Sequence, residues 1–223
     1  MRCAVIIFPG TSGDRDLIYA IKDTLGYEAS PVSHTETNLD EYDVIFLPGG
    51  FSYGDYLRNG AIASITPIIP AIKKAADDGK LVLGIGNGFQ ILVEAGILPG
   101  ALLENESTKF VCEQTEVIVQ NNQTNFTKDY KHGEKIRLPI AHGEGRYYAD
   151  KEIIEELKSS NRIIFTYVDN PNGSLEAIAG ITNEAGNVLG MMPHPERAVE
   201  TLLGNEVGKR LFQSILRTWE GAK

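Results

Sequence analysis

The chain has 223 residues, of which 42% are hydrophobic, and its 30 acidic and 21 basic side chains give a formal charge of −9. A chain of this length buries a substantial core without covalent cross-links, so we expect a single globular domain over residues 1–223. The acidic balance, without any basic stripe, argues against nucleic acid as a partner. No apolar run approaches the roughly 18 residues that a membrane span requires.

The two cysteines, Cys3 and Cys112, need no disulfide in a chain of this size. We interpret both as reduced cytosolic thiols that serve as apolar packing. The sequence opens with a predicted core strand rather than a signal peptide, which favours a cytoplasmic protein. Asn-x-Ser/Thr triplets are then chance matches in surface loops, and they begin at Asn105, Asn122, Asn125 and Asn172.

The first hundred residues alternate between short apolar runs and amphipathic segments. Each run predicts a strand and each segment a helix, and this alternation predicts a doubly wound, mostly parallel sheet with helices on both faces. Functional residues are then expected at the carboxyl ends of the strands. The expected strands are residues 3–8, 28–32, 44–47 and a run from Leu81, and the expected helices contain residues 17–25 and 67–76.

From about residue 110 to residue 148 the pattern changes, and two runs separated by turns predict an antiparallel ribbon at the edge of the sheet. A short helix at 153–157 and three strands follow, and the turn at 183–186 joins the last two strands as a hairpin. Together these elements predict an α/β fold of flavodoxin-like type. The ribbon strands are 115–119 and 135–139, the later strands are 163–168, 177–181 and 188–192, and the last helix carries Val207, Leu211, Ile215 and Trp219 on one stripe.

The most informative stretch is residues 81–92, where an apolar strand turns through glycines into a second apolar run with helical spacing. One interpretation is a dinucleotide-binding fingerprint, because Gly84 and Gly86 open a helix, but the third small residue would fall at Phe89. The other is a nucleophile elbow, whose strained residue projects from the end of the sheet towards the next helix. That projecting position is Gly86, which has no side chain.

Two further segments follow the ends of predicted strands. Residues 47–56 are rich in glycines whose amides are free to point at a ligand, although a flexible turn is an equal alternative. No Gly-Lys-Ser/Thr follows, so the segment is not a phosphate loop. In the extended, proline-framed segment 193–196, His194 and Glu196 face the same side. A histidine near a strand end is usually structural, but this pair suits a carboxylate that orients an imidazole in a nucleophilic triad.

Four motifs together resemble the class I glutamine amidotransferase family, and the resemblance extends from the first strand to the last helix. Each motif alone is weak, whereas four in the right order are specific. They are residues 48–55 (PGGFSYGD), 84–90 (GIGNGFQ), 141–145 (AHGEG) and 193–197 (PHPER).

The resemblance implies a glutaminase that hydrolyses glutamine to glutamate and ammonia through a Cys-His-Glu triad. Carried over by position, Gly86 stands where the cysteine belongs, His194 transfers the proton and Glu196 orients the ring. The backbone amides of Gly50 and Asn87 form the oxyanion hole. The residues implied to hold glutamine are Gly49, Phe51, Gln90 and His142, while His142 and Glu144 are alternatively assigned to shaping the pocket or a subunit interface.

The resemblance also implies partners. Ammonia passes to a large ATP-dependent synthetase subunit, accompanied by a small accessory subunit, which converts formylglycinamide ribonucleotide to formylglycinamidine ribonucleotide in purine biosynthesis. ATP and magnesium are expected on that synthetase, and neither a metal nor a cofactor is expected in this chain.

Gly86 removes the group on which the family's chemistry depends. The family forms a thioester on a cysteine whose pKa is lowered by a helix amino end and a histidine. Glycine adopts the strained turn without a Cβ clash, so we expect a folded protein that binds glutamine without hydrolysing it.

Two rival classes stay open. A non-catalytic scaffold or glutamine-sensing subunit explains the missing thiol but gives His194 and Glu196 no chemical purpose. A cysteine hydrolase of the related protease and chaperone superfamily places its histidine directly after the elbow nucleophile, where this chain has Asn87.

Overall fold

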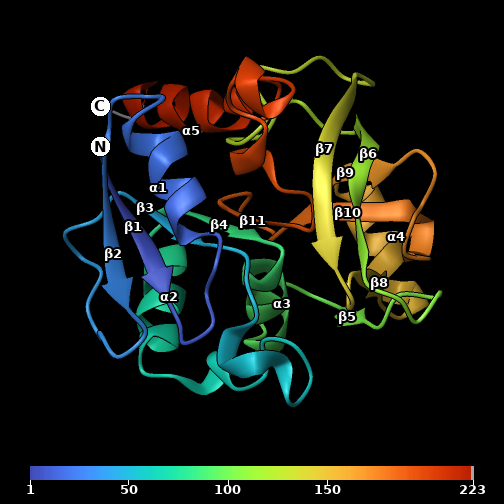
Figure 1. Cartoon of the computed structure of the whole chain (residues 1–223), viewed down its shortest axis with the longest axis horizontal. Helices are drawn as coiled ribbons and strands as arrows, with labels where there is room; N and C mark the ends of the chain where they lie inside the picture. The colour runs from blue at the N-terminus through green and yellow to red at the C-terminus, as the bar shows by residue number, and fades with distance from the viewer. Residues whose placement is uncertain (222–223) are drawn as a thin grey trace.

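Within residues 1–221, which the computed structural model describes, the chain forms a nine-stranded mixed sheet, a two-stranded sheet and five α-helices (Figure 1). The predicted domain boundary at residue 223 lies outside these residues. The strands are β1 Arg2–Ile7, β2 Glu28–Ser33, β3 Val44–Leu47, β4 Leu81–Ile85, β5 Ala101–Leu103, β6 Val111–Val119, β7 Lys135–His142, β8 Arg146–Tyr148, β9 Ile163–Tyr167, β10 Ile178–Thr182 and β11 Val188–Met191. The helices are α1 Asp14–Lys22, α2 Ile68–Asp77, α3 Asn87–Glu94, α4 Lys151–Ser159 and α5 Lys209–Gly221.

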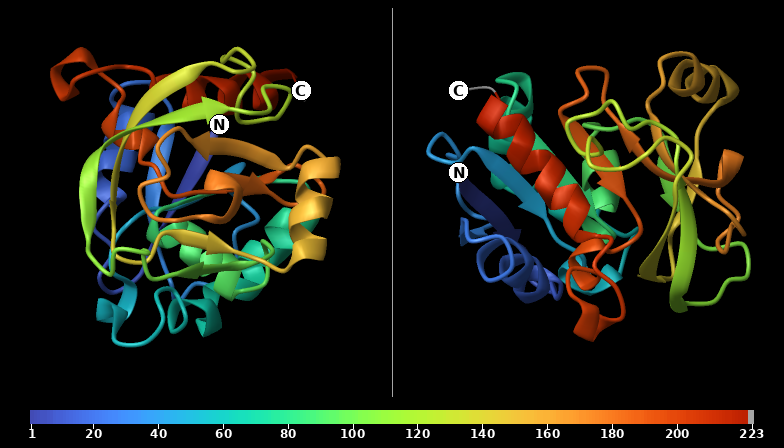
Figure 2. Two further views of the ribbon diagram at one scale, coloured as in Figure 1. Left: turned by 90° about the vertical axis from the view of Figure 1, so that its right-hand side faces the viewer. Right: turned by 90° about the horizontal axis from the view of Figure 1, so that it is seen from above.

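The large sheet has a parallel half and an antiparallel half, in the order β2-β1-β3-β4-β11-β10-β9-β6-β7. The strands from β2 to β11 pair in parallel, and those from β11 to β7 pair antiparallel. The predicted α/β class is therefore confirmed. The antiparallel part is larger than a two-stranded ribbon, because the short β10–β11 connection can join only antiparallel neighbours and so reverses the strand direction inside the sheet. Figure 2 shows the long, curved β6 and β7 at the end of the molecule away from β2.

Side-chain alternation along β1 divides the interior into two cores. Ala4 and Ile6 pack in a core with α2 and α3, whereas Cys3 and Val5 pack in a second core with α1 and α5. Successive side chains of a strand point to opposite faces, so a strand that is apolar at every position is buried on both. Helices thus cover both faces of the parallel half, as predicted.

Two sequence-based expectations were wrong in detail, and one small sheet was missed. Cys3 is buried, but Cys112 is exposed, because it lies on the solvent face of β6 while Thr115 and Val117 alternate onto the buried face. The last helix begins at Lys209, so Val207 precedes it. The small β5–β8 sheet was not predicted, since runs of three residues carry too little periodicity.

The register of the parallel half determines where the motif-bearing loops meet. Leu47 pairs with Gly84, and Gly84 with Gly190, so β3, β4 and β11 end side by side. The segments that follow them therefore leave the sheet at one edge. No helix within residues 1–221 is long and apolar enough to cross a membrane.

Candidate active site

Gly86 forms the sharp turn between β4 and α3, with φ 53° and ψ −111°. Its N–H donates to the carbonyl of Met191 at 2.8 Å, and its own carbonyl accepts from Phe89 and Gln90 at 3.0 and 3.2 Å. A positive φ of this kind favours glycine over any residue with a Cβ. The turn therefore has the backbone of the predicted elbow, held at both ends by hydrogen bonds.

His194 lies against the open side of this turn. A Cβ built on Gly86 would lie 3.2 Å from Nε2 and 3.1 Å from Cε1 of the His194 ring. On the other side of the ring, Nδ1 is 2.6 Å from Oε1 of Glu196. Both residues are at most 3% exposed. The position of the missing side chain thus faces an imidazole that is bonded to a carboxylate.

The carboxylate fixes the tautomer of His194. A carboxylate only accepts, so the proton on that bond belongs to Nδ1, and Nε2 is left as an acceptor. Within residues 1–221, Nε2 of His194 and Oε2 of Glu196 have no hydrogen-bond partner. The ring is therefore oriented to take a proton from an atom attached at position 86.

The sequence predicted that the segment carrying His194 is extended, and this prediction was wrong. Pro195–Arg197 forms a short 3-10 helix, with His194 immediately before it. The backbone N–H of His194 donates to the carbonyl of Pro139 in β7 at 2.8 Å. The histidine and the glutamate still meet, because the tight turn after Pro195 folds the carboxylate back onto the ring.

The loop after β3 is pinned rather than flexible. Phe51 N–H donates to Gly10 O at 2.9 Å and Ser12 N–H to Gly49 O at 3.2 Å, which makes Thr11 and Gly50 an antiparallel pair. These bonds flank the pair, so the N–H of Gly50 itself points away from Thr11. A Cβ on Gly49 would lie 2.7 Å from Cε1 of His194, so only glycine allows this approach.

Asn87 and Gln90 connect the elbow to two loops. Asn87 is the first residue of α3, and its N–H therefore has no acceptor within the helix. Its side chain accepts from Ser52 N–H at 3.2 Å and donates to Gln90 Oε1 at 2.8 Å. Gln90 in turn donates to the carbonyl of Glu144 at 2.6 Å. Both predicted residues are buried, and their side chains are already bonded to the protein.

His142 ends β7 and is a second buried histidine, 4% exposed. Its Nδ1 lies 3.0 Å from Oδ1 of Asn105, and its Nε2 has no partner within residues 1–221. Burial, and then the neighbouring His194, lower its pKa to about 4. Asn105 and Asn172 were wrongly interpreted as surface residues: they are 1% and 0% exposed. No local signal could reveal a partner 37 residues away.

Six of the predicted residues line one small cavity, together with Asp55 and Asn59. Its volume of about 20 Å³ accommodates roughly one water molecule, so an amino acid requires the surrounding loops to open. Gly49 packs beside it against His194, and Glu196 lies behind that ring. The six are Gly50, Phe51, Asn87, Gln90, His142 and His194.

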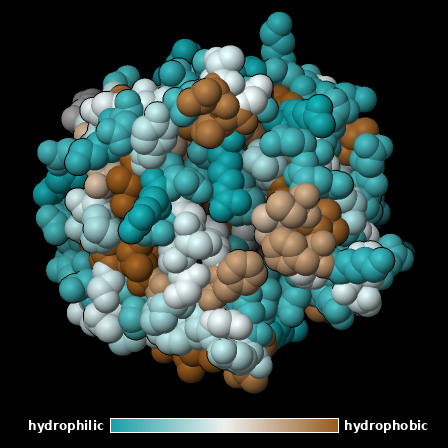
Figure 3. Space-filling model, in the orientation of Figure 1, coloured by the Kyte–Doolittle hydropathy of each residue, from teal (hydrophilic) through white to brown (hydrophobic). Residues whose placement is uncertain are grey.

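The cavity mouth is partly apolar. Phe51 is 48% exposed, and its ring lies 6.2 Å from that of Phe110. On the face drawn in Figure 3, hydrophobic patches stand apart from one another in a largely hydrophilic surface. Aromatic residues that stay exposed beside a cavity suit contact with a ligand or partner.

Asp55, for which the sequence suggested no role, also faces this cavity. Its φ is 53°, and its Oδ1 is buried without a partner within residues 1–221. Burial, and then the charge of Glu144, raise its pKa to about 6. Glu144 accepts from the N–H of Asn59 at 3.2 Å, so it helps to hold the loop in place.

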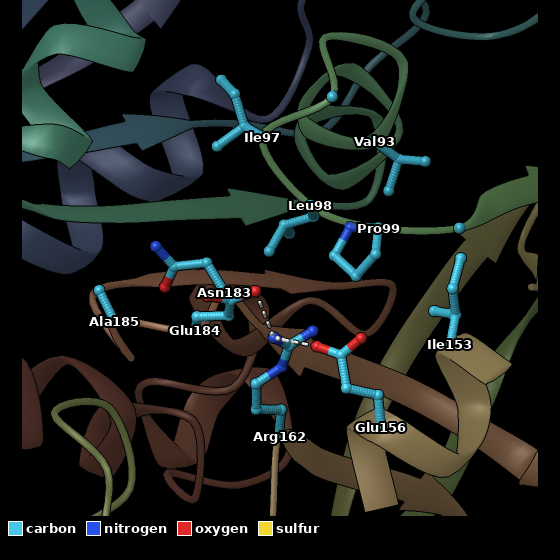
Figure 4. Close-up of a pocket in the computed structure, with 12 residues that line it drawn as sticks. Val93, Ile97, Leu98, Pro99, Ile153, Glu156, Arg162, Asn183, Glu184 and Ala185 are labelled. Carbon is cyan, nitrogen blue, oxygen red and sulfur yellow. Dashed lines mark hydrogen bonds and ion pairs between the residues drawn. The ribbon is translucent and has the colours of Figure 1, made fainter. Parts of the chain in front are cut away.

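A larger cavity, of about 600 Å³, lies beside the end of α3 that is remote from the elbow (Figure 4). Its buried cation, Arg162, already pairs with Glu156 at 3.1 Å and with Glu184 at 3.7 Å. It shares no lining residue with the cavity at His194. Nε of Arg162 is also without a partner in the described residues, but the unpartnered ring nitrogens of His142 and His194 belong to the smaller cavity.

Comparison with known proteins agrees with this geometry. The model of the CobB/CobQ-like glutamine amidotransferase domain matches residues 1–220. The chain belongs to this family. The predicted resemblance to the glutamine amidotransferases is thus confirmed, and the dinucleotide-binding interpretation of the glycine turn is left without support.

Among solved structures, this amidotransferase is similar to PurLQS from Thermotoga maritima, with 52% identity over 98% of each chain and a TM-score of 0.90. Another glutamine amidotransferase from Thermotoga maritima is 17% identical over 100% of this chain and 85% of that chain, with a TM-score of 0.61. The glutaminase domain of Trypanosoma brucei CTPS is 13% identical over 99% of this chain and 94% of that chain, with a TM-score of 0.63. At such low identity, the last two similarities show the fold alone.

Proposed function

We propose that this chain is the glutaminase subunit of phosphoribosylformylglycinamidine (FGAM) synthase, in a form that cannot hydrolyse glutamine. The observation that carries the proposal is the 3.2 Å between Nε2 of His194 and the Cβ position of residue 86. A cysteine there would place its sulfur beside a base oriented by Glu196, which is the arrangement of a nucleophilic triad.

With a cysteine at position 86, each part of the site has a task. The sulfur attacks the side-chain carbonyl carbon of glutamine, and the thiol proton passes to Nε2 of His194. The tetrahedral intermediate then expels its nitrogen, which takes that proton and leaves as ammonia. Water adds to the resulting thioester, the thiol departs, and glutamate is released. Glu196 keeps the ring oriented throughout and stabilises its charged form.

Two backbone amides are available for the negatively charged oxygen of that intermediate. The N–H of Gly50 points away from Thr11, and the N–H of Asn87 opens α3 without a helical acceptor. Both residues line the cavity with His194. Such a donor typically contributes about 3 kcal/mol to transition-state stabilisation. Phe51, Gln90 and His142 line the same space and are proposed to hold the substrate.

In the form described, Gly86 leaves the chemistry without its nucleophile. Loss of a triad nucleophile commonly lowers turnover on the order of a million-fold. Glutamine binding needs no thiol, so the chain is proposed to bind the substrate and retain it.

The proposed destination of ammonia is a large synthetase subunit, which carries ATP and magnesium and acts with a small accessory subunit. The 52% identity to PurLQS over 98% of both chains supports this assignment. Cys3 and Cys112 are both free, in keeping with the proposed cytoplasmic location. We assign the whole chain, residues 1–223, to one glutaminase domain.

The test is ammonia release from glutamine by this chain, Gly86→Cys and Gly86→Ala, each assembled with the cognate synthetase and accessory subunits. Of the three forms, we expect only Gly86→Cys to release ammonia. Gly86→Ala is the matched control, because it introduces the same Cβ and backbone strain without a thiol. Ammonia release from the glycine form at the rate of Gly86→Cys, or none from Gly86→Cys in an assembled complex, contradicts the proposal.

The absent side chain at Gly86 also favours a second candidate, a non-catalytic glutamine-binding or scaffold subunit of the same fold, whose site has lost its thiol. The two candidates differ in what one substitution achieves. A scaffold with a decayed site assembles with the synthetase and stays inactive as Gly86→Cys, whereas a disabled glutaminase regains turnover.

A further inference from the structure

His142 and Asn105 form a hydrogen-bonded pair at the cavity wall that the triad does not use. The side chain of His142 is 4% exposed and Asn105 is 1% exposed. Their contact joins Nδ1 of the ring to Oδ1 of the amide at 3.0 Å. The remaining ring nitrogen, Nε2, is buried without a partner within residues 1–221, and the residue lines the cavity.

The surroundings of Asn105 decide which way its amide points. The N–H of Gly145 donates to Oδ1 at 3.0 Å, while Nδ2 donates to the carbonyls of Lys109 and His142 at 2.8 and 2.9 Å. A flipped amide would lose all three bonds. Oδ1 therefore faces the ring as an acceptor, the ring proton belongs to Nδ1, and Nε2 carries a lone pair.

Burial keeps this ring neutral. The pKa of His142 is lowered to about 4, first by burial and then by His194. Its Nε2 is consequently an acceptor at neutral pH, on a ring that belongs to the lining of the cavity. A buried acceptor without a donor is unfavourable, and a ligand that supplies an N–H removes that cost.

We propose that Asn105 holds His142 as a hydrogen-bond acceptor that selects the carboxamide of glutamine over the carboxylate of glutamate. This inference rests on the proposed function and adds a specificity residue and its positioning partner. The side-chain amide of glutamine offers two N–H donors to Nε2, whereas ionised glutamate offers only oxygen lone pairs, which repel it. A site built to bond an N–H rejects an analogue that lacks it, because its own polar group is left unpaired.

The same contact has a consequence for turnover. Hydrolysis converts the amide, which satisfies His142, into a carboxylate, which does not. The product is thus bound less favourably than the substrate, so glutamate leaves and the cavity is free for the next glutamine. Asn105 acts only through the ring and is a positioning residue.

Equilibrium binding tests the inference on this chain, because the Gly86 form holds glutamine without consuming it. Isothermal titration calorimetry on the assembled complex gives Kd for glutamine and for glutamate. We expect His142→Phe to raise the Kd for glutamine about tenfold and to change the Kd for glutamate less than about threefold. The preference for glutamine over glutamate therefore falls. Asn105→Asp, which favours a protonated ring that donates from Nε2, is expected to shift the ratio further towards glutamate.

Asn187→Asp is the matched control, since Asn187 is also buried and donates to two backbone carbonyls, those of Ala76 and Lys80, away from the cavity. We expect it to leave the ratio unchanged. If His142→Phe weakens the binding of glutamine and the binding of glutamate equally, the side chain only supports the fold and the inference is overturned. If the unsubstituted complex binds no glutamine, the proposed function itself is wrong.

Nuclear magnetic resonance of the ring nitrogens gives an independent readout that needs neither ligand nor activity. With nitrogen-15 labelled histidine, the His142 ring is expected to carry its proton on Nδ1 and none on Nε2 at neutral pH. The opposite tautomer overturns the inference even if glutamine binds.

Discussion

Two buried histidines face the same cavity, and they differ in the group that holds them. The Nδ1 of His194 is bonded to the carboxylate of Glu196, whereas the Nδ1 of His142 is bonded to the carboxamide of Asn105. In both rings Nε2 lacks a partner within residues 1–221. A carboxylate stabilises a protonated ring, and a carboxamide does not. Burial therefore keeps the ring beside the carboxamide neutral, whereas the carboxylate of Glu196 can offset the charge of a ring that takes up a proton.

The largest expected effect comes from making the two partners alike. In a Gly86→Cys background, Glu196→Gln replaces the carboxylate behind His194 by a carboxamide. We expect kcat to fall roughly 10³- to 10⁴-fold, because the ring loses its fixed tautomer and the stabilisation of its charged form. Steady-state ammonia release with the cognate subunits measures this. Glu200→Gln is the control, because the Glu200 carboxylate accepts a hydrogen bond from Tyr19 and not from His194. We expect its kcat to stay within about twofold of the Gly86→Cys value.

A fall of less than tenfold in Glu196→Gln would mean that the carboxylate does not control His194. The distinction between the two rings would then be one of position and not of chemistry.

The second prediction concerns the pH dependence of stability. The pKa of His142 is about 4 in the folded chain against 6.5 for a free ring, so the unfolded chain binds a proton between these values and the folded chain does not. The stabilisation is present above pH 6.5 and is lost as pH falls towards 4. The loss attributable to this ring is on the order of 3 kcal/mol.

Chemical unfolding at several pH values checks this by comparison with His142→Gln, which has no ring to titrate. The free energy of unfolding of the unsubstituted chain should fall more steeply between pH 6.5 and pH 4. Parallel curves would show that His142 titrates alike in both states.

The third prediction tests how closely His194 packs on the elbow. Both Gly86→Ala and Gly86→Cys should lower the free energy of unfolding by about 1–3 kcal/mol, because φ is 53° and the new Cβ would meet the ring at 3.1 Å. Gly143→Ala is the control: its Cβ would touch only Phe110, at 3.7 Å, and we expect a change within about 0.5 kcal/mol. Denaturant titration measures all three, and an unchanged stability in Gly86→Ala contradicts the proposed strain.

The smallest effect is expected at Asp55, a third titrating group of the cavity. Its pKa is raised to about 6 by burial and by Glu144, so the folded chain holds a proton that the unfolded chain releases. The associated stability is present below about pH 4 and is lost as pH rises through 6, opposite in sign to that of His142. Asp55→Asn should therefore stabilise the chain more at about pH 7 than at about pH 4. An equal change at both values shows that Asp55 keeps its ordinary pKa.

Local chemistry explains what the sequence could predict. Glycines at a strand end impose the elbow at Gly86, and a proline-framed segment identifies His194 and Glu196 whatever the surrounding fold. The loop at Gly50 was found in the same way, although the choice between a flexible turn and a pinned one needed its bonds to residues 10–12. These features depend on neighbours within a few positions, and a single sequence contains that information.

The features that the sequence did not reveal depend on distant partners. Asn105 matters because β7 brings His142 against it, and Asp55 because a loop carries Glu144 beside it. Cys112 was misassigned for a related reason: residues 112, 114 and 116 on its face of β6 are exposed, which only the folded structure shows. Burial and polar partnership of this kind arise from tertiary packing.

The direction in which a side chain at position 86 points, towards Nε2 of His194, underlies the whole mechanism. The most direct test is mass spectrometry of acid-quenched Gly86→Cys in the assembled complex during turnover of glutamine. We predict a glutamyl adduct on the introduced thiol, absent from Gly86→Ala and from this chain. An adduct confined to Cys3 or Cys112, or no adduct in a complex that binds glutamine, would contradict the mechanism.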